Sequence, residues 1–198
     1  MPFFNDKYRV ESTRLHHRDY SSSGRYFITV CTKDRRPFFG EVIAGIMHRS
    51  PLGDIVAEEW LNTAKVRPNV ELDEWIIMPD HLHGILMIKC ASERREGADG
   101  EGEPGGNRKP GAIQETPVLE GFGRGTLKSG SIGAIIGQFK SICTKRIVAY
   151  GCRDFAWQPR FFDHVIRDEG SLISRRQYII DNPRNWELEG DYPENLEM

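Results

Sequence analysis

Apolar residues recur along this chain at two spacings, and each spacing predicts a different kind of element. Several segments are rich in β-branched and aromatic residues or alternate between apolar and polar positions, which is typical of strands. They are residues 25–33 (RYFITVCTK), 41–48 (EVIAGIMH), 70–79 (VELDEWIIMP) and 81–89 (HLHGILMIK), with a short β or irregular segment later at 155–167 (FAWQPRFFDHVIR). Pro79 and Asp80 predict a break between the third and fourth segments.

Three other segments carry apolar residues at helical spacing. Ser50 is a typical N-cap and Pro51 a typical first helical residue, and the helix that they begin is expected to end at Arg67-Pro68. Ser131 can cap a second helix, whose apolar stripe comprises Ile132, Ile135, Ile136, Phe139, Ile142, Cys143 and Ile147. The third helix is expected at about residues 168–182 (DEGSLISRRQYIIDN), with Pro183 ending it.

Residues 91–130 differ in composition from the rest of the chain. They contain ten of the twenty glycines, several prolines and few large apolar residues. Such a segment buries too little apolar surface to fold by itself, and no strand–GxGxxG–helix context indicates a phosphate loop. The length therefore predicts a single domain, residues 1–198, with a flexible insertion at about 91–130 whose deletion leaves folding and activity intact.

Composition and charge narrow the class of protein. The chain is 38% hydrophobic and 28% charged, and no apolar run reaches the roughly 20 residues of a membrane-spanning helix. The first residues lack a signal-peptide pattern and the four cysteines form no CxxC pair, so we expect a cytoplasmic protein with reduced thiols.

The formal net charge is −2, yet residues 123–186 hold eleven Lys and Arg against five Asp and Glu. That excess indicates either a phosphate-binding surface or an ordinary solvated face.

The run WIIMPDHLHGILMIK, residues 75–89, places two histidines one residue apart in an apolar strand. Residues i and i+2 of a strand point to the same face, so His81 and His83 present their rings together while Leu82 faces the core. The two imidazoles are either ligands of a metal site or histidines satisfied by hydrogen bonds at a strand end. A metal site would need at least one further ligand.

The last predicted helix offers the missing groups. Tyr178 and Asn182 are four residues apart and share one helix face. If this helix packs over the strand of the two histidines, a tyrosine hydroxyl and an amide oxygen reach the same site. A tyrosine hydroxyl is ordinarily protonated at neutral pH, and a metal ion that polarises a phosphate assists its attack. The alternative is a core tyrosine followed by a helix-terminal asparagine.

These motifs occur in an order that resembles a known family. The run MPDHLHG (residues 78–84) resembles the histidine–hydrophobe–histidine (HUH) motif of single-strand DNA transposases. The runs WQPRFFDH (157–164) and YIIDNP (178–183) are similar to the distal signature of the REP-associated tyrosine transposases, which belong with the insertion-sequence single-tyrosine transposases. Residues 26–31 (YFITVC) and 133–140 (GAIIGQFK) resemble the same family.

The resemblance implies a fold, a reaction and a cofactor. The implied fold is α+β and ferredoxin-like (RRM-like): an antiparallel sheet with helices over one face, the HxH motif on a central strand and the catalytic tyrosine on a late helix. Tyr178 is the implied nucleophile, which attacks single-stranded DNA near an imperfect hairpin and leaves a 5′-phosphotyrosine and a free 3′-hydroxyl. The implied metal is Mg²⁺, with Mn²⁺ as a substitute, and its implied ligands are His81, His83 and Asn182.

The DNA contacts and the oligomeric state are less defined. The candidates for contact with DNA are basic residues and one histidine in the distal half of the chain: Lys140, Lys145, Arg160, His164, Arg175 and Arg176. Arg160 and His164 serve equally well to orient the loop before the last helix. The resemblance allows both a monomer and a homodimer.

Two other functions remain open from the sequence. A protein with this fold can bind DNA hairpins without transposing them, and a metal-dependent hydrolase can use water in place of tyrosine. The presence of His81, His83 and Tyr178 together favours the transposase, because a binding module has no need of all three.

Overall fold

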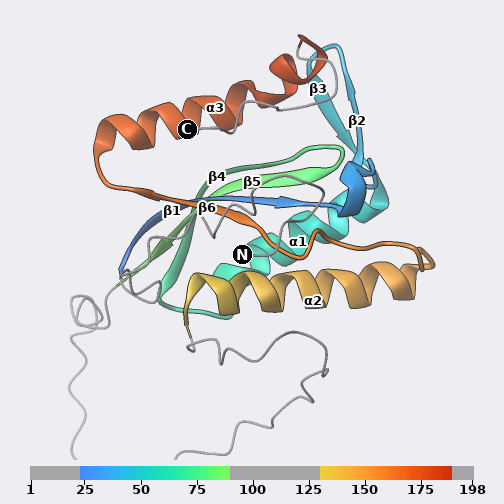
Figure 1. The fold of residues 1–198 in the computed structure, drawn as a ribbon, viewed down its shortest axis with the longest axis horizontal. Helices are drawn as coiled ribbons and strands as arrows, with labels where there is room; N and C mark the ends of the chain where they lie inside the picture. The colour runs from blue at the N-terminus through green and yellow to red at the C-terminus, as the bar shows by residue number, and fades with distance from the viewer. Residues whose placement is uncertain (1–22, 90–129, 189–198) are drawn as a thin grey trace, which may run out of the picture.

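The computed structural model of the protein describes residues 23–89 and 130–188, so the predicted insertion at 91–130 lies outside the described residues apart from Gly130. This part of the chain is a mixed α+β structure (Figure 1). Its elements, in chain order, are β1 (Gly24–Cys31), a short 3₁₀ helix (Lys33–Arg35), β2 (Gly40–Ile43), β3 (Ile46–Arg49), α1 (Pro51–Lys65), β4 (Val70–Ile77), β5 (His81–Ile88), α2 (Ile132–Tyr150), β6 (Phe162–Ile166) and α3 (Glu169–Leu188).

Four of these strands form an antiparallel sheet in the order β4-β5-β1-β6. Strand β5, which carries the histidine pair, is therefore an inner strand. Its register with β1 places Cys31 opposite His81 and Thr29 opposite His83. Strand β6 is at the edge, where His164 lies opposite Phe27. The sheet thus brings the end of β1 beside the start of β5.

Helices α1 and α2 cover one face of the sheet. They form the larger apolar core with alternate residues of β1 and β5, including Tyr26, Ile28, Val30, Leu82, Leu86, Val56, Trp60, Ile135, Ile136 and Phe139. Trp60 lies so close to β5 that a Cβ on Gly84 would be 2.5 Å from its ring. Glycine therefore follows the histidine pair for a packing reason, which is the close approach of the tryptophan.

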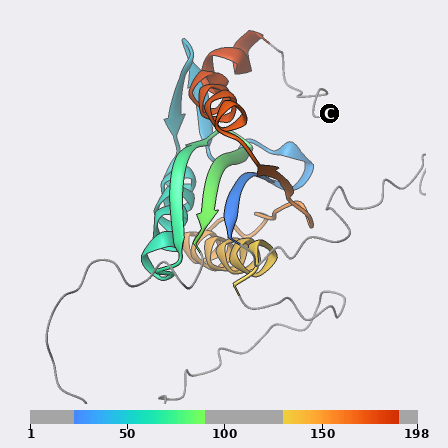
Figure 2. The same ribbon diagram turned by 90° about the vertical axis from the view of Figure 1, so that its left-hand side faces the viewer.

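Helix α3 covers the opposite face, so the expectation that the helices lie over one face is wrong. Figure 2 shows the sheet between α3 on one side and α1 and α2 on the other. A second apolar cluster joins α3 to the sheet: Phe27, Ile85, Ile166, Leu172 and Ile179. Strands β1 and β5 are buried along nearly their whole length, because α3 covers one face of the sheet and α1 and α2 cover the other.

Helix α3 continues to Leu188, so the prediction that Pro183 ends it is wrong. A proline inside a helix removes one backbone hydrogen bond and usually kinks or breaks the helix. Here Asn182 is 8% exposed, Pro183 is buried, and the ring of Trp186 lies 5.7 Å from that of His81. Burial of this last stretch against the sheet offsets the lost hydrogen bond.

The segment predicted as one short strand is a hairpin. Strands β2 and β3 pair through a two-residue turn at Ala44 and Gly45, whose φ angles are 51° and 72°. Positive φ at both positions is typical of a type I′ turn. The hairpin reaches the C-terminal part of α3 (Figure 1), where a Cβ on Gly45 would lie 3.2 Å from the side chain of Arg184. The hairpin therefore packs against the extension of α3 beyond Pro183.

The predicted starts of the first two helices are confirmed. The hydroxyl of Ser50 accepts a hydrogen bond from the backbone N–H of Gly53 at 3.2 Å, and Ser131 accepts one from Ala134 at 3.3 Å. Helix α1 ends at Lys65, two residues before the predicted stop. Within residues 23–89 and 130–188, no helix has the length and apolar character needed to cross a membrane.

Candidate active site

The two histidines lie at the start of β5 on the face that α3 covers. Both are 2% exposed, and their ring centroids are 4.4 Å apart. Leu82 points to the opposite face and belongs to the core under α1 and α2. The alternation read from the sequence is therefore confirmed, because a strand places alternate residues on opposite faces.

His81 is held by a carboxylate. Its Nδ1 is 2.6 Å from Oδ1 of Asp80, and the other oxygen of Asp80 is 2.8 Å from Nε of Arg35. A second guanidinium nitrogen of Arg35 donates to Sγ of Cys31 at 2.8 Å. The remaining ring nitrogen of His81, Nε2, is buried and has no hydrogen-bond partner among the described residues.

His83 is held by a hydroxyl and by aromatic rings. Its Nδ1 is 2.8 Å from Oγ1 of Thr29, and the ring of Phe27 stacks on it at a centroid distance of 5.3 Å. The hydroxyl of Tyr178 lies 3.4 Å from Nε2 of His83. Phe27 also contacts the ring of Tyr178 edge to face at 5.9 Å, so this phenylalanine lies beside both groups.

The environment keeps both imidazoles neutral. Burial, helped by the positive charge of Arg35, lowers the pKa of His81 to about 3. Burial also lowers the pKa of His83 well below its usual value. Smaller contributions in the same direction come from His81, Arg35 and Arg175. Burial raises the pKa of Asp80 to about 6, while Arg35 opposes that rise. Neutral imidazole is the form that binds a metal ion.

Helix α3 brings three side chains to this face of the sheet. Tyr178 is half-buried, Asn182 is buried one turn later, and Trp186 is half-buried one turn later again. The last helix therefore packs over the strand of the two histidines (Figure 1). The shared site predicted from the sequence depends on this packing. Trp186 was not anticipated, because it lies beyond Pro183.

The donor set fits a divalent metal ion. Both histidines use Nδ1 for a hydrogen bond within the protein, so Nε2 is the atom left on each ring for a ligand role. The described residues contain no cluster of three or more His, Cys, Asp and Glu that could hold a metal. A third protein ligand would therefore be of another kind, and the amide oxygen of Asn182 is the predicted one.

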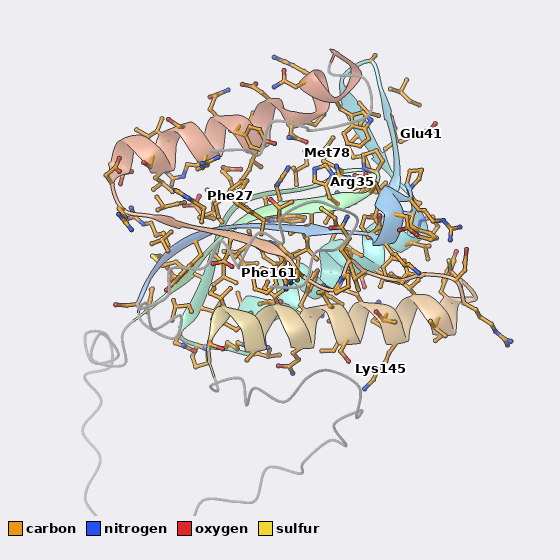
Figure 3. All side chains as sticks on the ribbon, viewed as in Figure 1. Phe27, Arg35, Glu41, Met78, Lys145 and Phe161 are labelled. Carbon is orange, nitrogen blue, oxygen red and sulfur yellow. The ribbon has the colours of Figure 1, made fainter. Side chains whose placement is uncertain are left out.

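The candidate DNA contacts on α2 are not brought to the site. Lys140 donates to the backbone oxygens of Gln158 and Arg160, at 2.5 and 3.3 Å, and burial lowers its pKa to about 8. It therefore holds the loop before β6. Lys145 is exposed on the side of α2 that faces away from the sheet (Figure 3).

The other residues predicted to contact DNA differ in their surroundings. Arg176 pairs with both carboxylate oxygens of Asp73 on β4, at 2.7 and 2.9 Å. Arg175 lies over the ring of Phe27 at 5.1 Å, and its charge helps lower the pKa of His164 after the larger effect of burial. His164 and Arg160 are exposed. Figure 3 shows Phe27 between the sheet and α3. Because the ring of Phe27 contacts both His83 and Tyr178, Arg175 lies at the edge of the candidate site.

Sequence reasoning missed Arg35, Asp80 and Thr29. Asp80 directly precedes the first histidine and was read only as part of a break. The period of two assigns Thr29 to one face of β1. Its contact with His83 also depends on the register between β1 and β5, which the sequence of a single strand does not give. Arg35 gave no signal, because its contact with Asp80 joins a turn after β1 to the start of β5.

Comparison with known proteins shows which fold and which family this chain shares. No protein-family model matches the chain. Its fold is similar to a solved structure of a REP-associated tyrosine transposase bound to a REP hairpin, with a TM-score of 0.51, 18% identity, and coverage of 87% of this chain and 74% of the other. At that identity the likeness concerns the fold.

The sequence match is to a protein of Haemophilus influenzae (strain Rd) described as uncharacterized. It is 35% identical over 181 residues, which cover 91% of this chain and 92% of the relative. The chain therefore belongs to the same family as this Haemophilus protein.

Proposed function

We propose that this chain is a metal-dependent transposase that cleaves and rejoins single-stranded DNA through Tyr178. One observation carries the proposal: the Tyr178 hydroxyl lies 3.4 Å from Nε2 of His83, although the two residues are 95 positions apart in sequence. The order of the HUH, WQPRF and YIIDNP motifs and the fold likeness to a REP-associated tyrosine transposase support the same conclusion.

His81, His83 and Asn182 would hold Mg²⁺ or Mn²⁺. The bound ion would polarise a phosphate oxygen and stabilise the charge that develops during attack. The protein's own contribution is to fix the two rings: Asp80 and Thr29 hold their Nδ1 atoms, and Phe27 stacks on His83. Rings fixed in this way need little rearrangement when a ligand binds.

Tyr178 would form the covalent bond. Its oxygen attacks the phosphorus of a DNA phosphodiester, the bond from phosphorus to the 3′-oxygen breaks, and the phenolic proton is balanced by the proton that the free 3′-hydroxyl gains. The product is a 5′-phosphotyrosine, which keeps the energy of the phosphodiester for rejoining. Arg175, at the edge of the site, would contact the phosphate, because arginine is suited to phosphate recognition.

The proposed substrate is single-stranded DNA beside a hairpin. The structural relative is a transposase bound to a REP hairpin, and this chain shares its fold. His164 lies opposite Phe27 on the edge strand β6 and Arg175 lies over the Phe27 ring, so these two side chains would contact a strand of DNA bound at the site. Lys140 is not part of this proposal, because it holds the loop before β6.

The experiment that tests the function is capture of the covalent adduct. The protein is incubated with single-stranded DNA from the flanks of its own gene and with Mg²⁺ or Mn²⁺, and denaturing gels are compared for wild type, Tyr178→Phe and His81→Ala. The matched control is Tyr150→Phe, since Tyr150 is 62% exposed at the end of α2. We expect an adduct in wild type and in Tyr150→Phe, none in Tyr178→Phe, and loss on addition of a chelator.

Two results would contradict the proposal. Cleavage that is metal-dependent but leaves no adduct, and that persists in Tyr178→Phe, would indicate a hydrolase that uses water. Binding of hairpin DNA without cleavage on any flanking sequence would indicate a DNA-hairpin binding protein that keeps the fold.

A further inference from the structure

Arg35 makes contacts that a surface arginine does not usually make. Its side chain is 20% exposed, and its Nε lies 2.8 Å from the nearly buried carboxylate of Asp80. One guanidinium nitrogen, NH2, is buried without a hydrogen-bond partner among the described residues. A buried donor without a partner lowers stability, so its presence in the structure calls for an explanation.

The backbone around Arg35 is strained. Asp34 and Arg35 have φ angles of 55° and 54°, a left-handed conformation that residues other than glycine rarely adopt. The turn is fixed by other segments, because the N–H of Thr32 donates to the carbonyl of Asp80 and the N–H of Lys33 donates to the carbonyl of Ala156, both at 2.8 Å. Figure 3 shows Arg35 and Met78 at the same end of the sheet. Strain that persists under such constraints is often found at functional sites.

The contacts of Arg35 lead to one of the two histidines. Asp80 bonds Arg35 through Oδ2 and His81 through Oδ1, at 2.8 and 2.6 Å. A carboxylate only accepts hydrogen bonds, so Nδ1 of His81 must donate and its lone pair must lie on Nε2. Nε2 is the buried ring atom without a hydrogen-bond partner among the described residues.

His83 has no equivalent arrangement. Its Nδ1 bonds the hydroxyl of Thr29 at 2.8 Å, and a hydroxyl can donate or accept. The hydroxyl therefore leaves both tautomers of His83 open, whereas the carboxylate selects one tautomer of His81. The two histidines of the pair differ in what orients them.

We propose that Arg35 is a positioning residue, which holds Asp80 so that His81 keeps its proton on Nδ1 and presents Nε2 to the metal site. This inference rests on the proposed metal site, but the relay from Arg35 through Asp80 to His81 exists without metal. Groups that orient metal-binding histidines through hydrogen bonds act in this way, and their loss typically weakens metal affinity about 10- to 100-fold.

The test compares Arg35→Gln with Arg36→Gln. Arg36 is the matched control, because it also loses an ion pair, with Asp154 at 2.7 Å, but an exposed one. The first readout is long-range ¹H–¹⁵N NMR of histidine-labelled, metal-free protein at pH 7.5, with His81 assigned from the His81→Ala spectrum. We expect Nδ1 to be protonated in wild type and Arg36→Gln and a mixture of tautomers in Arg35→Gln, with His83 as the internal reference.

The second readout is Mn²⁺ affinity, measured by calorimetry. We expect a loss of about 10- to 100-fold in Arg35→Gln, no change in Arg36→Gln, and partial recovery in Arg35→Lys, which keeps one donor for Asp80. If Arg35→Gln fails to fold, as judged by circular dichroism, Asp80→Asn takes its place. Its amide can donate or accept, so it predicts the same mixture of tautomers.

A wild-type tautomer and wild-type Mn²⁺ affinity in Arg35→Gln, or in a folded Asp80→Asn, would overturn the positioning role. Failure of the wild-type protein to bind Mn²⁺ would overturn the proposed metal site instead. In that case the NMR result alone would decide whether the relay sets the tautomer of His81. The two failures are therefore distinguishable.

Discussion

Arg175 and Arg176 are neighbours in sequence, but the fold gives their charges different partners. Both carboxylate oxygens of Asp73 accept from Arg176, so its charge is largely compensated. Among the described residues Arg175 has no ion pair, and it lies over Phe27, whose ring also contacts His83 and Tyr178. Of these two arginines, Arg175 is therefore the one that we expect to contact a phosphate.

This difference predicts opposite effects for two identical substitutions. Arg175→Gln should slow formation of the covalent adduct on the order of 100-fold, as loss of a donor to developing charge does. Arg176→Gln should leave the rate nearly unchanged and lower the unfolding free energy only slightly, because an ion pair near the surface contributes little to stability. Single-turnover rates and denaturant unfolding check both expectations. Equal rates in the two variants would exclude a phosphate contact by Arg175.

Gly84 allows Trp60 to pack directly on β5, one residue after the histidine pair. We predict that Gly84→Ala lowers the unfolding free energy by about 1–3 kcal/mol, because the added methyl group overlaps a ring that is fully buried and packed on Phe139. The control is Gly137→Ala on α2, where nothing lies within 4 Å of the added Cβ. It should raise stability by about 0.5–1 kcal/mol through helix propensity. Denaturant unfolding measures both, and an unchanged Gly84→Ala would mean that Trp60 can move aside.

At the scale of elements, α1 and α2 begin where local sequence places them. Both start at a serine whose hydroxyl accepts a backbone hydrogen bond. Helix α3 differs, because its length depends on contacts with the sheet and with the β2–β3 hairpin rather than on Pro183. Local signals are sufficient for the first two helices and insufficient for the third.

The two capping serines should differ in their contribution to stability. The hydroxyl of Ser50 also donates to the carbonyl of Phe38 at 2.8 Å, whereas the hydroxyl of Ser131 makes only the capping bond among the described residues. Ser50→Ala is therefore expected to lower the unfolding free energy by about 1–2 kcal/mol, and Ser131→Ala by about 0.5–1 kcal/mol. Chemical denaturation followed by circular dichroism measures the difference. The reverse order would show that the bond to Phe38 adds nothing.

At the scale of the whole molecule, part of the positive charge in residues 123–186 is compensated by acids from other elements. Arg146 pairs with Glu58 and Glu59, at 2.6 and 2.5 Å, and Lys140 donates to backbone oxygens. The compensating acids belong to α1 and β4, far from residues 123–186 in sequence. Charge available for DNA at the site is therefore expected around Arg175, and not at Arg146 or Lys140.

The segment between β5 and α2 should be dispensable. Strand β1 pairs with both β5 and β6, and α1 packs on α2, so strands and helices from both sides of residues 90–129 contact each other directly. Replacing residues 91–129 with a flexible linker should change the melting temperature by only a few degrees and preserve the covalent adduct. Loss of folding or of the adduct, measured by thermal melts and by the gel assay, would place this segment in the core or on the DNA path.

The sequence by itself determined most of the strands, the starts of the first two helices and the face that His81 and His83 share. These features depend on neighbours within a few residues, through the period of two in strands, helical spacing and capping. It also determined that Tyr178 and Asn182 share one helix face, because they are one turn apart.

Only the tertiary structure decided where that helix face lies. The cover of α3 on the second face of the sheet, its passage through Pro183 and the pairing of Arg176 with Asp73, 103 residues away, depend on contacts between distant segments. The same holds for the relay from Arg35 to His81. Such contacts follow from strand register and packing, which residues near one another in sequence do not encode.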